Sequence, residues 1–104
     1  MHKGEIWWAN LPKPTGRRPV LILTRDEALN IRDCITVAEI TTNIRRISTE
    51  VLLKKEDGLP RECVVNLDVI NTVRKESLVD FVMSLSEEKL QTVEKALKFA
   101  LDLC

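Results

Sequence analysis

Short apolar stretches separated by turn-forming residues make up most of the chain. The stretches share β-branched, aromatic and aliphatic side chains, which are typical of β-strands. They lie at residues 5–11, 19–23, 34–40, 50–53, 64–65, 69–73 and 78–83. Pro, Gly, Asn and charged residues stand between them and favour turns and loops. This rhythm predicts a small barrel of short strands.

The last segment of the chain has a different hydrophobic period. Its apolar residues recur at intervals of three and four positions, at Leu90, Val93, Leu97, Ala100 and Leu101. That period predicts an amphipathic helix over residues 87–103. Ser86 is the expected N-cap, and the two Glu residues after it suit the positive end of a helix dipole. A single helical turn is expected at residues 26–30.

The composition is that of one small folding domain. With 104 residues, 44% of them hydrophobic and 31% charged, the chain is neither disordered nor of low complexity. We expect residues 1–104 to form a single domain. The apolar run at residues 19–23 is far shorter than a membrane span, and the first residues lack a signal-peptide pattern. A cytoplasmic protein without membrane contact is therefore expected.

The residues that usually hold metals or cofactors are scarce. Cys34, Cys63 and Cys104 show no Cys-x-x-Cys spacing, so neither a disulfide scaffold nor a structural zinc site is expected. Cys34 and Cys63 lie in apolar surroundings, which favours buried, unreactive thiols. His2 is the only histidine, and the chain has no nucleotide-binding glycine motif and no nucleophile elbow. We expect no metal and no cofactor.

The formal net charge is zero, because 16 Lys and Arg balance 16 Asp and Glu. A neutral chain argues against a nucleic-acid partner, since phosphate binding needs positive potential. The charge is divided, however. Residues 1–46 hold eight basic against five acidic residues, a balance of +3, and the other 58 residues hold eight against eleven. This asymmetry points weakly to a basic face.

Two polar segments stand where predicted strands meet loops. Arg17, Arg18 and Pro19 open one strand, and Thr41 with Thr42 follows another. On composition alone, an exposed strand-end charge and a turn-capping hydroxyl pair explain both segments without any function.

Four sequence blocks occur in order along the chain. They are Gly4–Leu11 (GEIWWANL), Arg17–Leu23 (RRPVLIL), Ile40–Asn43 (ITTN), and Gly58–Arg61 (GLPR) with Val64–Asn66 after it (VVN). Together they resemble the MazF/PemK toxins of bacterial toxin–antitoxin modules, over nearly the whole chain. The resemblance implies a mainly β fold, a small SH3-like barrel of the CcdB/PemK type with a C-terminal amphipathic helix, usually as a homodimer. It also implies a sequence-specific, metal-independent endoribonuclease that a cognate antitoxin silences.

The resemblance assigns two residues to catalysis. The family's essential arginine matches Arg18, and its essential threonine matches Thr41. Without a metal, the ribose 2′-hydroxyl can attack the phosphate and leave a cyclic phosphate and a 5′-hydroxyl, so the protein mainly positions and stabilises. Arg18 is expected to stabilise the developing negative charge, and Thr41 to hold the scissile phosphate. The general base stays unassigned, because a guanidinium keeps its proton.

Residues on both sides of this pair are expected to bind RNA. Many relatives carry a longer first connection with a Gly-Ser-Glu element, which is shortened here to residues 12–17. One of Trp7 and Trp8 is expected to be exposed as a stacking platform and the other to be core, since adjacent strand residues face opposite ways. The expected RNA-binding residues are Lys13, Thr15, Arg17, Thr42, Asn43, Arg45 and Arg46.

Two other functions stay open. A gyrase poison of the CcdB type has a similar fold but needs neither Arg18 nor Thr41, and this chain lacks the Trp-Gly-Ile ending that such a protein would carry. A non-catalytic binding module on the same barrel is the second alternative.

Overall fold

Six strands and two α-helices follow one another in the computed structural model, which describes residues 1–104. Two short 3₁₀ turns, at Lys55–Asp57 and Lys75–Ser77, connect some of them. The elements are β1 (Glu5–Asn10), β2 (Arg17–Ile22), α1 (Asp26–Leu29), β3 (Cys34–Thr41), β4 (Glu50–Leu53), β5 (Cys63–Arg74), β6 (Leu78–Ser84) and α2 (Glu87–Ala100).

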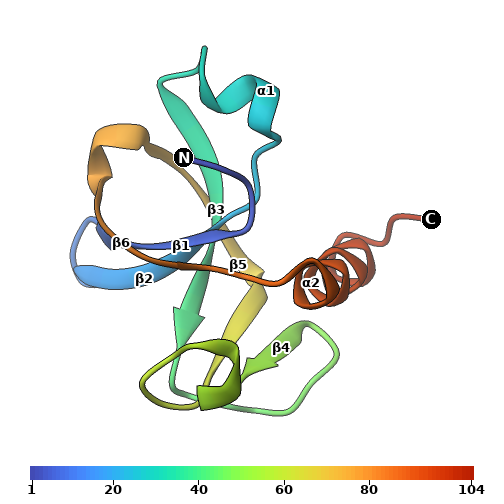
Figure 1. The fold of residues 1–104 in the computed structure, drawn as a ribbon. Coiled ribbons are helices and arrows are strands. Elements are labelled where there is room, and N and C mark those ends of the chain that lie inside the picture. Colours follow the sequence, from blue (N-terminus) through green and yellow to red (C-terminus); the bar gives the residue numbers. More distant parts are fainter.

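The strands form one antiparallel sheet in the order β4-β5-β3-β2-β1-β6. The sheet curls on itself, with α2 against one side and α1 at one end (Figure 1). Its edge strands, β4 and β6, do not pair with each other, so the curled sheet is a half-barrel. The predicted fold class, mainly β with a C-terminal helix on a small SH3-like barrel, is confirmed in this open form.

Two of the predicted apolar stretches belong to one strand. The sequence pattern separates residues 64–65 from residues 69–73, whereas β5 runs through both. In the β3–β5 ladder, Ala38 lies opposite Ile70, but the next residue, Glu39, lies opposite Asn66. The three extra residues of β5 form a bulge that bends the strand, and the first half of β5 also pairs with β4.

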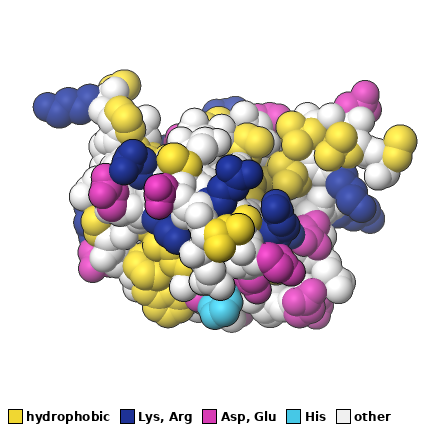
Figure 2. Space-filling model, turned by 90° about the horizontal axis from the view of Figure 1, so that it is seen from above, with side chains coloured by type: hydrophobic (Ala, Val, Ile, Leu, Met, Phe, Trp, Pro, Cys, Tyr) yellow, Lys and Arg dark blue, Asp and Glu magenta, His cyan; other side chains and the backbone are white.

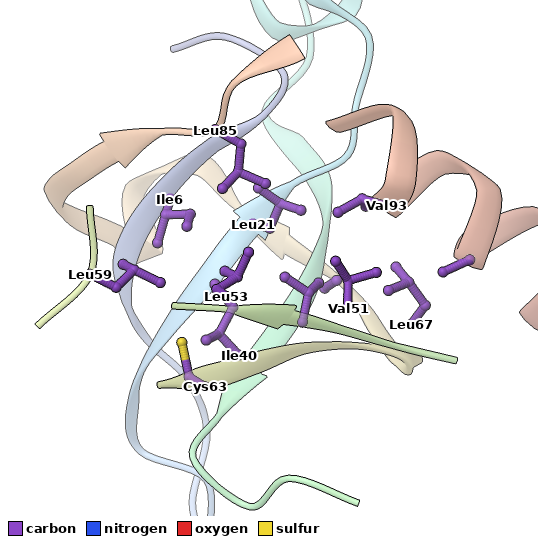
Figure 3. Close-up of a cluster of buried hydrophobic side chains, with 13 residues drawn as sticks. Ile6, Leu21, Ile40, Val51, Leu53, Leu59, Cys63, Leu67, Leu85 and Val93 are labelled. Atoms are coloured by element: carbon purple, nitrogen blue, oxygen red, sulfur yellow. The ribbon is translucent and has the colours of Figure 1, made fainter. Parts of the chain in front are cut away.

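Apolar side chains fill two clusters on opposite faces of the sheet. Leu21 of β2 belongs to the larger cluster, whereas its neighbours Val20 and Ile22 belong to the smaller one. The continuous apolar run of β2 is thus buried on both faces, as predicted. The larger cluster lies between the sheet and α2, from which Val93 reaches into it (Figure 3).

The C-terminal helix begins as predicted and ends earlier. The Ser86 side chain accepts a hydrogen bond from the backbone N–H of Lys89 at 3.1 Å, which confirms the N-cap. The helix ends at Ala100 rather than at residue 103. Beyond it, Leu101 and Leu103 are exposed, and hydrophobic side chains gather where this end of α2 projects, on the right of Figure 2. Neither helix has the length and apolar character that crossing a bilayer requires.

One of the three thiols is buried and two are exposed. Cys63 is buried, as predicted, but the prediction of a buried Cys34 is wrong, because this side chain is exposed. Cys34 is the first residue of β3, and its side chain points to the opposite face of the sheet from that of the next residue, Ile35. The strand therefore buries Ile35 and leaves Cys34 exposed. Burial raises the pKa of the Cys63 thiol, and the negative charge of Asp57 acts in the same direction.

Candidate active site

Arg18 and Thr41 lie on neighbouring strands at the same end of the sheet. Arg18 is the second residue of β2, and Thr41 is the last residue of β3. The β2–β3 ladder pairs Val20 with Glu39, and the same register two residues further brings Arg18 level with Thr41. Residues directly opposite each other on antiparallel strands project from the same face of a sheet, so the side chains of Arg18 and Thr41 leave the sheet in the same direction.

Both residues line one cavity of about 350 Å³ at this end of the sheet. Buried apolar residues form its floor, among them Ile6 and Ile40. Exposed side chains from two strands, β1 and β2, and from the loops after β3 and before β5 stand at its rim. The full lining consists of Ile6, Trp8, Arg17, Arg18, Pro19, Ile40, Thr41, Thr42, Leu59, Pro60, Arg61, Cys63 and Val82. An apolar base with a few polar groups around it is the usual composition of a ligand site.

The Thr41 hydroxyl is held by its own turn. Its oxygen accepts a hydrogen bond from the backbone N–H of Asn43 at 3.2 Å. A hydroxyl that accepts one hydrogen bond still has its proton to donate. The turn therefore orients the Thr41 oxygen and leaves one donor for a ligand in the cavity.

Of the two tryptophans, only Trp8 lines the cavity. The Trp8 side chain is 37% exposed. Trp7 points to the other face of the sheet, where its ring meets that of Phe81 edge to face at 5.7 Å between centroids. The two tryptophans face opposite ways, as predicted, and Trp8 is the exposed one; Trp7 is half-buried against the smaller apolar cluster rather than within the core.

Arg17 covers part of the Trp8 ring. Its guanidinium carbon lies 5.1 Å from the ring centroid, within the range of a cation–π interaction. The same guanidinium donates from Nη2 to Oδ2 of Asp80 on β6 at 2.7 Å. A base that stacks on Trp8 would share this surface with Arg17.

The structure brings only some of the expected RNA-binding residues to the cavity. Arg17 and Thr42 line it. The others, Lys13, Thr15, Asn43, Arg45 and Arg46, do not line it. Lys13 and Thr15 belong to the tight turn between β1 and β2, which the backbone closes through a 2.9 Å hydrogen bond from the Leu11 N–H to the Gly16 carbonyl.

Sequence reasoning missed Arg61 as a residue of the site. Gly58, with φ of +104°, ends the 3₁₀ turn before β5 in a conformation that favours glycine. The chain then turns so that Leu59 is buried while Pro60 and Arg61 line the cavity. The signal was present, because these residues form one of the four blocks on which the family resemblance rests.

Carboxylates accompany both arginines that open β2. Arg17 pairs with Asp80 at 2.7 Å, and Arg18 lies 3.6 Å from Glu39. Arg61, in contrast, has no ion-pair partner and is the free cation at the cavity rim. No three His, Cys, Asp or Glu side chains are grouped so as to hold a metal ion.

The loop between β3 and β4 is organised by a buried carboxylate. The Glu50 side chain is only 1% exposed. Its Oε1 accepts hydrogen bonds from the backbone N–H groups of Arg45, at 2.9 Å, and Arg46, at 3.2 Å. Arg46 has a φ of +58°, and two successive N–H groups in such a turn form a concave anion site. Glu50 thus fixes the loop that carries both arginines.

Replacing Glu50 by Ala is expected to lower the free energy of unfolding by about 1–3 kcal/mol, because two backbone N–H groups lose their acceptor. Urea unfolding followed by circular dichroism measures this. Glu56→Ala is the matched control, because Glu56 is exposed and makes no ion pair. Equal stability of the Glu50→Ala variant and the parent protein would contradict this role of Glu50.

A family model matches the chain over residues 2–101, and its description is PemK-like, MazF-like toxin of type II toxin-antitoxin system. The chain is 37% identical over 101 residues to the probable endoribonuclease MazF5 of Mycobacterium tuberculosis (strain H37Rv), covering 96% of this chain and 92% of the relative. It is 30% identical over 109 residues to the endoribonuclease EndoA of Bacillus subtilis (strain 168), covering 97% and 94%.

Solved structures show the same architecture. The toxin MazF-mt6 of Mycobacterium tuberculosis superposes with a TM-score of 0.88 at 33% identity, covering 96% of this chain and 98% of that chain. A mycobacterial endoribonuclease in complex with its cognate antitoxin superposes with a TM-score of 0.89 at 25% identity, covering 100% and 97%. The likeness extends over at least 96% of this chain in both cases.

Proposed function

The chain belongs to the PemK-like, MazF-like toxins of type II toxin–antitoxin systems, and we propose that it is a sequence-specific endoribonuclease that cleaves single-stranded RNA without a metal ion. Relatives that match nearly its full length carry the name endoribonuclease. The observation that carries the proposal is the shared cavity of Arg18 and Thr41. A guanidinium and a hydroxyl on one face of neighbouring strands suit a phosphodiester group.

Cleavage proceeds by attack of the ribose 2′-hydroxyl oxygen on the adjacent phosphorus. The new P–O2′ bond replaces the P–O5′ bond, which leaves a 2′,3′-cyclic phosphate and a 5′-hydroxyl. Arg18 stabilises the negative charge that develops on the phosphate oxygens and donates toward the leaving oxygen. The Thr41 hydroxyl, oriented by the Asn43 N–H, donates to the phosphate and holds it in line.

The test is incubation of the purified protein with a long RNA in excess EDTA. Discrete fragments are expected, with 5′-hydroxyl ends that polynucleotide kinase labels directly. The Arg18→Ala protein, purified in the same way, separates this activity from a contaminating ribonuclease. Intact RNA would contradict the proposal and favour the alternatives with this fold, a CcdB-type gyrase poison or a non-catalytic binding module.

RNA binding is expected to depend on salt. Arg17, Arg18 and Arg61 stand at one cavity, and contact with about three phosphates gives a slope of about −2 in a plot of log affinity against log salt for a single strand. Fluorescence anisotropy with an RNA that carries 2′-O-methyl groups measures binding without cleavage. An affinity independent of salt would contradict this groove.

The remaining proposals concern partners. A cognate antitoxin is expected to inhibit the protein with an acidic segment that competes with RNA for the cavity, since a carboxylate and a phosphate bind the same arginines.

A homodimer is also expected, in which a second copy covers apolar surface that this chain exposes. A molar mass equal to that of one chain, measured by light scattering, would contradict the homodimer. Because RNA is the proposed substrate, we expect the protein to act in the cytoplasm.

A further inference from the structure

Glu39 is a mostly buried carboxylate beside the candidate site. It lies on β3 two residues before Thr41, and its side chain is 12% exposed. A charged group in such a place is costly unless a partner compensates for the lost water. Glu39 does not line the cavity itself, so its partners determine what it does.

The two oxygens of Glu39 have different partners. Oε1 lies 3.6 Å from Nη1 of Arg18 on β2. Oε2 accepts a 2.7 Å hydrogen bond from Nδ2 of Asn71 on β5. The bulge of β5 begins at this point, because the β3–β5 register shifts between Ala38 and Glu39. Bulges commonly redirect side chains next to active sites, and here Asn71 holds the carboxylate from the side away from Arg18.

One edge of the Arg18 guanidinium therefore faces a carboxylate, in an ion pair whose 3.6 Å separation is longer than a hydrogen bond. A guanidinium carries five N–H donors in a rigid plane, so attraction at Nη1 orients the other donors as well. The Arg18 side chain is 36% exposed and lines the cavity. An exposed arginine without such a partner samples many rotamers, whereas electrostatic catalysis needs donors that are already in place.

We propose that Glu39 is a positioning residue for Arg18: its carboxylate, held by Asn71, fixes one edge of the guanidinium so that the remaining donors face the scissile phosphate. The inference rests on the proposed function, in which Arg18 acts on that phosphate. Its effect lies in the transition state, where the negative charge on the phosphate is largest. Ground-state binding gains nothing from Glu39, because its negative charge repels RNA.

The test is a double-mutant cycle in single-turnover RNA cleavage. Glu39→Ala is expected to lower the cleavage rate about tenfold to a hundredfold without weakening RNA binding. Glu39→Gln, which keeps an acceptor for Arg18, is expected to recover part of the rate. In an Arg18→Ala background, Glu39→Ala is expected to cost nothing further. Glu76→Ala is the matched control, because Glu76 pairs with Arg74 at 3.0 Å away from the cavity.

The outcomes separate this inference from the proposed function. An equal loss in both backgrounds would overturn the positioning role, because partial unfolding or direct catalysis by Glu39 acts without Arg18. Full activity of Glu39→Ala, together with a large loss in Arg18→Ala, would overturn the role of Glu39 alone. Full activity of Arg18→Ala would remove the proposed site and, with it, the residue through which Glu39 acts.

Discussion

Replacing Arg18 by Ala is expected to slow RNA cleavage by about a hundredfold to a thousandfold, which is the usual effect of removing one preorganised donor to developing charge. Arg18 is the second residue of β2, and its side chain is partly exposed. Its removal leaves both apolar clusters complete, and the stability it costs is that of leaving Glu39 with Asn71 as its remaining partner. Single-turnover cleavage of a fixed RNA, with urea unfolding of the same preparation, measures both quantities.

Two controls make this result specific to the site. Arg74→Ala removes another arginine that belongs to a strand and pairs with a carboxylate, and it is expected to cleave at the parental rate. His2→Ala is expected to change little as well, because His2 lies outside the cavity and is exposed. Arg18→Lys keeps the charge without the planar fork and is expected to be intermediate. Near-parental cleavage by Arg18→Ala would exclude Arg18 from the site.

The sequence predicted those parts of the fold that depend on local pattern. The apolar run of β2, the period of α2 and the cap at Ser86 are set by neighbouring residues, and all three are confirmed. The bulge in β5 was missed, because polar residues within a strand look like the end of the strand. The exposure of Cys34 was missed because an apolar stretch does not show to which face of the sheet its first residue points.

The candidate site was predictable only in part, for a related reason. The positions of Arg18 and Thr41 at strand ends can be read from the sequence, and the register of β2 and β3 then brings them together. Ion pairs between distant segments cannot be read in this way. Asp80 is 63 residues from Arg17 along the chain, so the basic first half looked more positive than the folded surface is.

These ion pairs show why the zero net charge says little about the positive charge that is free to bind phosphate. Four arginines of the basic first half were expected at the site, at positions 17, 18, 45 and 46, and a carboxylate lies within 4.0 Å of three of them. We expect the affinity for phosphate to depend on exchange of partners, in which RNA competes with Asp80 for Arg17, for example. Arg61 lines the cavity without a carboxylate partner, so we expect it to bind phosphate without such an exchange. Local geometry, rather than total charge, is then expected to govern RNA binding.

Replacing Thr41 by Val is expected to slow cleavage by about a hundredfold to a thousandfold. Valine keeps the shape and the β-branched backbone preference of threonine but lacks the hydroxyl that would hold the phosphate. It also removes the acceptor for the Asn43 N–H, so the turn after β3 loosens. The same single-turnover assay measures the loss, and binding of the 2′-O-methyl RNA shows how much of it comes from binding.

Serine at position 41 distinguishes the chemistry of the hydroxyl from the packing of the side chain. Thr41→Ser keeps both the donor to phosphate and the acceptor for Asn43, so it is expected to retain most of the activity. Thr36→Val is the matched control, because Thr36 is a half-buried residue of the same strand that lies outside the cavity. If Thr41→Val cleaved at the parental rate, or if Thr41→Ser were as slow as Thr41→Val, the hydroxyl would not be the group that acts on the phosphate.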